Sequence, residues 1–105
     1  ITDDIIVASG DNPKRYNNVV ISKAADTMLA MAGIEATFVV ARTSDSTVNI
    51  SARSHKTINV QRIMEKMGGG GHFNLAACQL RDCSVAQAKN KLIETIMGEL
   101  APKED

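Results

Sequence analysis

The chain has 105 residues, which is enough for one domain with its own hydrophobic core but not for two. Apolar residues make up 44% of it and charged residues 23%, and no apolar run approaches the roughly 20 residues of a membrane-spanning helix, so neither a disordered nor a membrane-embedded chain is expected. Twelve basic and twelve acidic residues give a formal net charge of zero, which argues against nucleic-acid binding through a broad basic surface.

The first half of the chain predicts a strand, a helix and a β-hairpin. We expect a strand over Ile5–Val7, a polar loop over Ser9–Asn18, a helix over Val19–Ala32, and hairpin strands over Ala36–Thr43 and Thr47–Ser54. Gly33 stands where a left-handed cap would end the helix. The first hairpin strand is apolar on both faces, which is typical of a strand covered on both sides.

The second half predicts two further helices and a short strand. Asn59 is a predicted N-cap, and Ser84 with Gln87 matches a capping box. We expect a helix over Val60–Met67 that ends at Gly68, a buried strand over Leu75–Leu80, and a helix from Val85 to Leu100. This order predicts an α/β fold in which residues 1–105 form a single domain, a mixed β-sheet packed with about three helices.

Four consecutive glycines, Gly68–Gly71, separate the second helix from the next strand and are followed by His72. Without Cβ atoms a backbone can approach a ligand closely, and successive N–H groups can form a concave anion-binding nest. The run lacks the Gly-Lys-Ser or Gly-Lys-Thr ending of a Walker motif, and it does not follow a strand as a dinucleotide fingerprint does. These residues alone leave two interpretations open, a phosphate-binding loop and a helix cap with a flexible hinge.

His72 and Arg53 are the side chains best suited to accompany such a loop. A neutral imidazole both donates and accepts hydrogen bonds, although a lone histidine is often structural. The second hairpin strand alternates, so Asn49, Ser51 and Arg53 form a polar face from which Arg53 could pair bidentately with a phosphate. Five basic and two acidic side chains lie between residues 36 and 72, so an anion is expected in this part of the chain.

The sequence lacks the clustered side chains of a metal-dependent hydrolase. It has two histidines, no clustered Asp or His motif, and no evident Ser-His-Asp or Cys-His grouping. Cys78 and Cys83 have no companions at zinc-ligand spacing, so we expect free thiols in a reducing, cytoplasmic setting. We therefore expect no catalytic residue, metal site or cofactor in this chain, which would bind a substrate without cutting it.

Several segments together resemble the type-one DHH-associated domain of the DHH phosphoesterase superfamily. They are Ala24–Leu29, Ile50–Ser54, Asn59–Val60 with Met64–Met67, and Gly68–Gln79 (GGGGHFNLAACQ). The resemblance extends from about Ile5 to Leu100, and within the family it is strongest to the C-terminal end of GdpP-like cyclic-di-AMP phosphodiesterases. It implies that the chain is the DHH-associated, substrate-binding lobe of a larger protein.

This resemblance implies a division of labour within the parent enzyme. An upstream DHH lobe of the same chain would hold two manganese ions and hydrolyse cyclic-di-AMP to linear pApA, whereas this lobe would be inactive alone. By the family pattern Gly69, Gly70, Gly71 and His72 would contact the nucleotide and its phosphate, and Arg53 would add a cationic clamp. The parent would act in signalling as a possible homodimer, anchored to the cell membrane with this domain in the cytoplasm and out of direct membrane contact.

Three other interpretations stay open. The lobe of an oligonucleotide exonuclease or nanoRNase would use the same loop, but those relatives tend to follow the histidine with a basic residue and Ala-Ala-Gly, unlike the segment Phe73–Cys78. A non-catalytic RNA-binding or dimerising module, such as that of alanyl-tRNA synthetases, is expected to replace His72 with a more basic pattern. The third is a structural domain with an accidental glycine loop.

Overall fold

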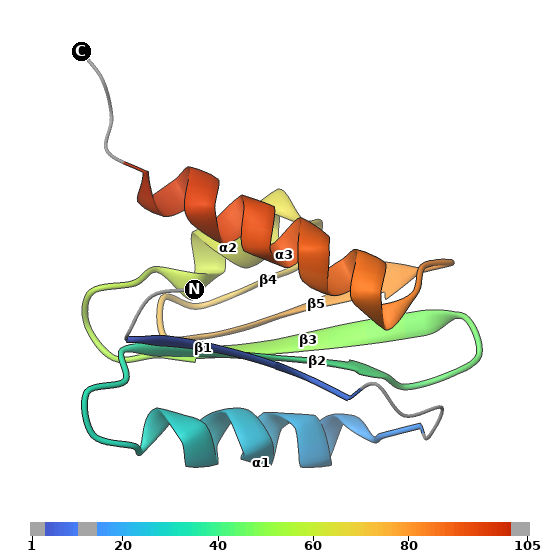
Figure 1. The fold of residues 1–105 in the computed structure, drawn as a ribbon, viewed down its shortest axis with the longest axis horizontal. Helices are drawn as coiled ribbons and strands as arrows, with labels where there is room; N and C mark the ends of the chain where they lie inside the picture. The colour runs from blue at the N-terminus through green and yellow to red at the C-terminus, as the bar shows by residue number, and fades with distance from the viewer. Residues whose placement is uncertain (1–3, 11–14, 102–105) are drawn as a thin grey trace.

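The chain folds into three layers, with a central sheet between one helix on one face and two helices on the other (Figure 1). The computed structural model describes residues 4–10 and 15–101. Within them a five-stranded sheet has the order β1-β2-β3-β5-β4, so the predicted α/β class with a mixed sheet and three helices is confirmed. The elements are β1 (Ile5–Ser9), α1 (Asn18–Leu29), β2 (Ala36–Arg42), β3 (Thr47–Ser54), α2 (Val60–Lys66), β4 (Gly70–Gly71), β5 (Leu75–Arg81) and α3 (Val85–Leu100).

One parallel and three antiparallel pairings make the sheet mixed. β1 and β2 run parallel and are joined through α1, because parallel neighbours need a crossover connection. β2 and β3 form the predicted hairpin, and β3 also pairs antiparallel with β5. The two-residue strand β4, which the sequence did not predict, pairs antiparallel with β5 and forms one edge of the sheet.

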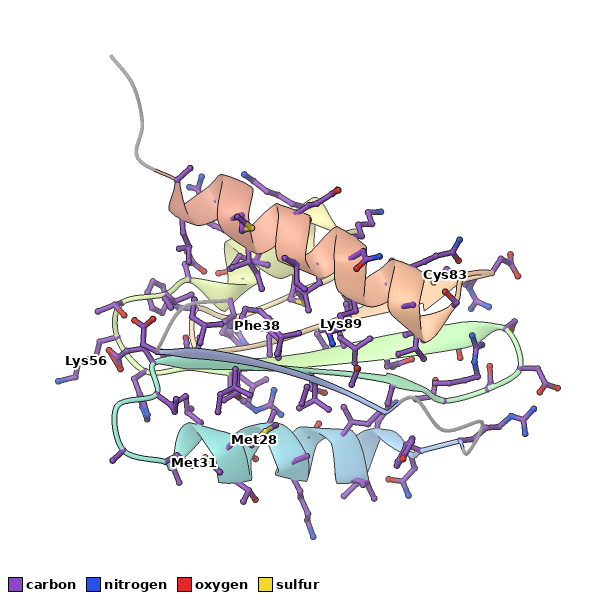
Figure 2. All side chains as sticks on the ribbon, viewed as in Figure 1. Met28, Met31, Phe38, Lys56, Cys83 and Lys89 are labelled. Carbon is purple, nitrogen blue, oxygen red and sulfur yellow. The ribbon has the colours of Figure 1, made fainter. Side chains whose placement is uncertain are left out.

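The hydrophobic core is divided between the two faces of the sheet. The larger part, on the face of α2 and α3, includes the fully buried side chains of Phe38, Ile63, Met64, Leu92 and Ile96. The smaller part, under α1, consists of Ile21, Ala25, Val39 and Ala41. Figure 2 shows Phe38 between the sheet and α3, and because β2 contributes to both parts it is buried on both faces, as predicted.

All three helices begin at residues whose side chains accept a backbone hydrogen bond. Asn17 accepts from the N–H of Val20 at 2.9 Å, Asn59 caps α2, and Ser84 forms the predicted capping box with Gln87. None of the helices in the two described ranges is long and apolar enough to cross a membrane.

Helix α1 is shorter than the sequence predicted. It ends at Leu29 instead of Ala32, with Ala30 as its cap, and Gly33 adopts its left-handed φ of 81° in the turn that follows. That turn is closed by a hydrogen bond from Ile34 N–H to the Met31 carbonyl at 3.2 Å, because the chain must reverse to start β2 beside β1. Of the predicted polar loop over Ser9–Asn18, residues 11–14 lie outside the described residues, and the two terminal residues belong to β1 and α1.

The prediction that Leu75–Leu80 is a buried strand is wrong for one of its two faces. In β5 only Ala76 and Cys78 are buried, whereas Leu75 is 52% exposed and Ala77 and Gln79 are also exposed. The reason is the position of α1, which packs on β2 and β3 and leaves this side of β5 uncovered. An open strip of sheet therefore lies between α1 and β4.

Helix α3 is tied to α2 by Glu99. Its carboxylate accepts from Arg62 Nε at 2.6 Å and from Lys66 Nζ at 2.5 Å, and its side chain is 15% exposed. The hydrogen bond from Lys66, together with Arg62, holds the pKa of Glu99 below its ordinary value of 4.5, although burial acts in the opposite direction. Because the folded pKa is lowered, this contribution to stability is present above pH 4.5 and is lost as the pH falls through the folded value.

We expect Glu99→Gln to lower the free energy of unfolding at about pH 7 by less than about 1 kcal/mol, since solvent screens the two half-exposed cations. At about pH 3 the variant and the unchanged protein should differ less, because Glu99 becomes protonated as the pH falls through its lowered pKa and a neutral carboxyl group no longer attracts the two cations. Urea unfolding at both pH values measures this difference, with Glu94→Gln on the exposed face of α3 as the control. A deficit of equal size at both pH values would contradict the ion pair.

Candidate functional site

The glycine run forms the end of α2 and the edge strand β4 instead of a simple loop. Gly68 has a left-handed φ of 91°, and its N–H bonds to the Glu65 carbonyl at 3.1 Å, so it ends the helix as predicted. The N–H of Gly69 then bonds to the Met64 carbonyl at 2.8 Å. Gly70 and Gly71 follow as β4, which places their backbone at the exposed edge of the sheet.

Three of the four glycines are required by the fold itself. A Cβ on Gly69 would lie 2.1 Å from the Ala77 carbonyl oxygen, and one on Gly71 would lie 2.4 Å from that of Leu75. Gly68 needs its positive φ, which side chains with a Cβ rarely adopt. Gly70 has neither constraint, because a Cβ there would meet nothing within 4 Å. The missing side chain of Gly70 therefore leaves open space over the backbone that packing does not explain.

The backbone at this edge also presents an outward N–H group. His72 and Leu75 exchange hydrogen bonds in both directions, from His72 N–H at 2.7 Å and from Leu75 N–H at 3.3 Å. Since hydrogen-bonded and non-hydrogen-bonded pairs alternate along an antiparallel ladder, the next pair, Gly71 with Ala76, is non-hydrogen-bonded. The N–H of Gly71 therefore points away from β5, where an anion can accept from it.

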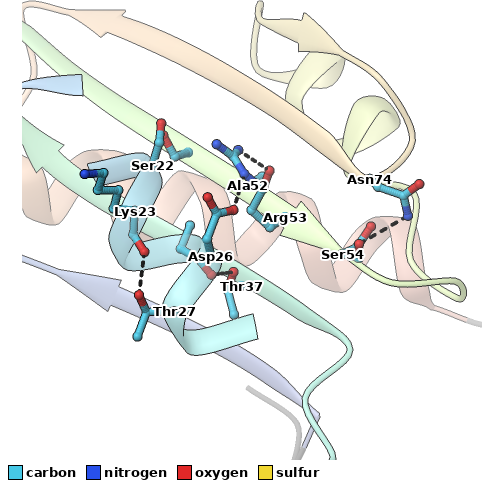
Figure 3. Close-up of polar contacts among 11 residues, drawn as sticks. Ser22, Lys23, Asp26, Thr27, Thr37, Ala52, Arg53, Ser54 and Asn74 are labelled. Carbon is cyan, nitrogen blue, oxygen red and sulfur yellow. Dashed lines mark hydrogen bonds and ion pairs between the residues drawn. The ribbon is translucent and has the colours of Figure 1, made fainter. Parts of the chain in front are cut away.

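The turn after His72 is held against the end of β3. Ser54 donates from its N–H to the Asn74 carbonyl at 3.0 Å and from its hydroxyl to the Phe73 carbonyl at 3.1 Å. The Asn74 side chain donates back to the Ser54 carbonyl at 3.2 Å (Figure 3) and also to that of His55. No role was predicted for Ser54 or Asn74, and the only signal in the sequence was the preference of asparagine for turns. Because Arg53 directly precedes Ser54, these bonds also fix the position of His72 relative to Arg53.

Arg53 and His72 lie at the same end of the sheet. Arg53 pairs with Leu75 in the register of β3 and β5, and Leu75 in turn pairs with His72. Because directly opposite residues share a face, Arg53, Leu75 and His72 emerge on the same side of the sheet, the side of α1. Two strand spacings separate the backbones of Arg53 and His72, about 10 Å. The structure therefore places all five predicted site residues toward one end of the sheet, where Gly69 packs against β5.

The guanidinium of Arg53 is buried, but not all of its N–H donors form hydrogen bonds within the described part of the chain. Its side chain is 11% exposed, its Nε donates to Asp26 at 2.8 Å, and its Nη1 donates to the Ala52 carbonyl at 2.9 Å (Figure 3). Its Nη2 makes no hydrogen bond to any residue in the described ranges. The end of the guanidinium, with its planar pair of donors, therefore remains available for a bidentate anion.

Arg53 belongs to a polar seam between β3 and α1, which confirms the predicted polar face of the strand. The seam consists of three cross-contacts, Asn49 to Asn18 at 2.9 Å, Ser51 to Ser22 at 3.3 Å and Arg53 to Asp26 at 2.8 Å. The contacting residues recur every two positions along β3, a rise of about 6.6 Å, and every four positions along α1, a rise of about 6 Å. Because the two rises are similar, successive residues of the strand and the helix lie opposite each other. The four-residue spacing of these α1 residues was a signal that the sequence analysis did not use.

The segment that was predicted to be cationic is not a free basic surface. Arg62 and Lys66 share Glu99, and Arg42 donates to the Cys83 carbonyl at 2.8 Å. Lys56 lies in an exposed loop at one end of the molecule (Figure 2). Arg53 is therefore the buried cation of this segment with donors to spare, and strand β5 separates it from the glycine strand β4.

Metal-ligating groups and reactive thiols do not gather at this site. Residues 4–10 and 15–101 contain no group of three or more His, Cys, Asp or Glu side chains that could hold a metal ion. Both cysteines are free, as predicted, and Cys78 is buried with its Sγ 3.1 Å from the Met67 carbonyl. Burial raises the pKa of the Cys78 thiol, which keeps it protonated and unreactive at neutral pH.

Comparisons with known proteins find relatives of this chain. The family described as the DHHA1 domain matches residues 3–101. The chain is 47% identical over 94 residues to the cyclic-di-AMP phosphodiesterase PdeA of Listeria monocytogenes serotype 1/2a (strain 10403S), covering 90% of this chain and 14% of that protein. It is 47% identical over 96 residues to the cyclic-di-AMP phosphodiesterase GdpP of Bacillus subtilis (strain 168), covering 90% and 15%. The chain thus spans a small part of the length of these relatives.

A solved structure shows the same fold at much lower identity. The pGpG-specific phosphodiesterase PggH from Vibrio cholerae superimposes with a TM-score of 0.59 at 15% sequence identity. The match covers 93% of this chain and 34% of that one. At this identity the likeness concerns the fold alone.

Alanine substitutions should separate the glycines that the fold needs from the one that it does not. We expect Gly69→Ala and Gly71→Ala each to lower the free energy of unfolding by roughly 2 kcal/mol or more, because their Cβ atoms would meet the backbone of β5. Gly70→Ala should change it by less than about 1 kcal/mol. Urea unfolding measures all three, and a Gly70→Ala loss as large as the other two would contradict the open space over β4.

Proposed function

We propose that this chain, which belongs to the DHHA1 domain family, is the substrate-binding lobe of a phosphodiesterase that hydrolyses cyclic-di-AMP to linear pApA. The observation that carries the proposal is the open backbone of Gly70 and the outward N–H of Gly71, which lie at the same end of the sheet as the partly occupied guanidinium of Arg53. A phosphodiester is an anion that each of these groups suits, since its non-bridging oxygens accept from a backbone N–H or from a guanidinium.

Each residue of the site would have a distinct part in holding the dinucleotide. Gly71 N–H and the end of the Arg53 guanidinium would bind phosphate oxygens, and the bare Gly70 backbone would let the phosphate come close. His72, exposed at the sheet edge next to Gly71, would donate a hydrogen bond to the phosphate or to the leaving oxygen. Gly69 would act indirectly, because its packing on β5 sets the position of β4.

The hydrolytic step is assigned to another part of the enzyme. The residues described here do not provide a metal-binding cluster. In the proposal an upstream DHH lobe of the same protein holds the manganese, and this lobe closes over the substrate. The larger size of the relatives supports a second lobe, since the chain covers 14% and 15% of them.

The setting of the parent enzyme follows from the same family. We expect it to act in cyclic-dinucleotide signalling, with this domain in the cytoplasm, where free thiols such as those of Cys78 and Cys83 persist. Membrane anchoring and dimerisation would be properties of the parent, outside this domain.

A side-by-side assay of the intact enzyme with manganese tests the proposal. We expect turnover of cyclic-di-AMP to exceed that of its linear product and of short RNA in kcat/KM. His72→Ala should lower cyclic-di-AMP turnover about tenfold or more without changing the thermal unfolding midpoint, because the side chain is exposed. The isolated domain should show no turnover. Preference for RNA would indicate a nanoRNase lobe, and binding without turnover by the intact protein would indicate an RNA-binding module.

A further inference from the structure

We infer that Asp26 is a positioning residue that aims the guanidinium of Arg53 at the substrate phosphate. This inference rests on the proposed function, because it concerns the arginine of the same site. Asp26 lies on α1, 27 residues before Arg53.

The contact between the two side chains is directional. Asp26 Oδ1 accepts from Arg53 Nε at 2.8 Å, and the carbonyl of Ala52 accepts from Nη1 at 2.9 Å. These two bonds use two of the five N–H donors of a guanidinium. Together they fix the plane of the group relative to α1 and to the backbone of β3. The remaining donors, on Nη1 and Nη2, form the outer end, which is the pair that binds a phosphate bidentately.

The backbone of Asp26 is itself held in place. The buried hydroxyl of Thr37 on β2 (Figure 3) donates to the carbonyl of Ala25 at 2.8 Å, and the Ala25 side chain is fully buried between α1 and the sheet. This bond locks α1 to the sheet one residue before Asp26. A carboxylate fixed in this way can hold Arg53 in one orientation before a ligand arrives, which reduces the entropy lost on binding.

A purely electrostatic role for Asp26 predicts the opposite effect. The Asp26 side chain is 61% exposed, and its negative charge near a bound phosphate would weaken anion binding by repulsion. Removal of a carboxylate that only balances charge should therefore improve phosphate binding. Removal of one that orients Arg53 should impair it, so the sign of the change distinguishes the two roles.

A double-mutant cycle in the intact enzyme tests the inference. We expect Arg53→Ala to raise the KM for cyclic-di-AMP about tenfold or more with kcat changed less than about threefold, since a phosphate clamp acts in the ground state and the transition state alike. Asp26→Ala should raise KM about fivefold, and Asp26→Asn, which keeps an oxygen for Nε–H, should stay within about twofold. In the Arg53→Ala background, Asp26→Ala should add no further increase.

The control is Asp45→Ala, which removes an exposed carboxylate that also pairs with an arginine, Arg15, but outside the seam. It should leave KM unchanged. An unchanged or lowered KM for Asp26→Ala, or an equal increase in the Arg53→Ala background, would overturn the inference. If Arg53→Ala itself leaves KM unchanged, Arg53 lies outside the site and the inference fails with it. Absence of cyclic-di-AMP turnover in the unchanged enzyme would reject the proposed function instead, and the cycle would then be run with the substrate that is turned over.

Discussion

The close approach of β4 to β5 is the constraint on which the candidate site depends. Atoms of the β5 backbone occupy the places where Cβ atoms of Gly69 and Gly71 would lie, so only glycine permits this edge strand. The approach places the N–H of Gly71 at the rim of the sheet and leaves the backbone of Gly70 uncovered. Of the two interpretations left open by the sequence, the helix cap is confirmed for Gly68, and phosphate binding stays a proposal.

The site is assembled from four segments that are distant in the chain. The seam residue Asp26 comes from α1, Arg53 from β3, the glycines from the end of α2 and β4, and Asn74 from the turn before β5. Hydrogen bonds from Ser54 join the turn to the strand that carries Arg53. Because strands and a helix bonded to the sheet carry these groups, the proposed site would be ordered before a substrate binds.

Local signals allowed much of the fold to be predicted from the sequence. The capping residues Asn59, Ser84 and Gln87, the alternation in β3 and the apolar run in β2 each depend on nearby residues alone. β4 could not be predicted, since two glycines carry no strand propensity and their pairing with β5 depends on the close approach. The exposure of Leu75 and the bond between Asp26 and Arg53 depend on where α1 packs, and no local pattern gives that position.

A structure of the intact enzyme with a non-hydrolysable phosphorothioate analogue of cyclic-di-AMP tests the central claim most directly. We expect a phosphate oxygen within about 3 Å of the Gly71 nitrogen and another at the same distance from Arg53 Nη2. We also expect the Asp26 contact to Nε to persist in the complex. A dinucleotide bound with both phosphates away from the β4 edge would contradict the account.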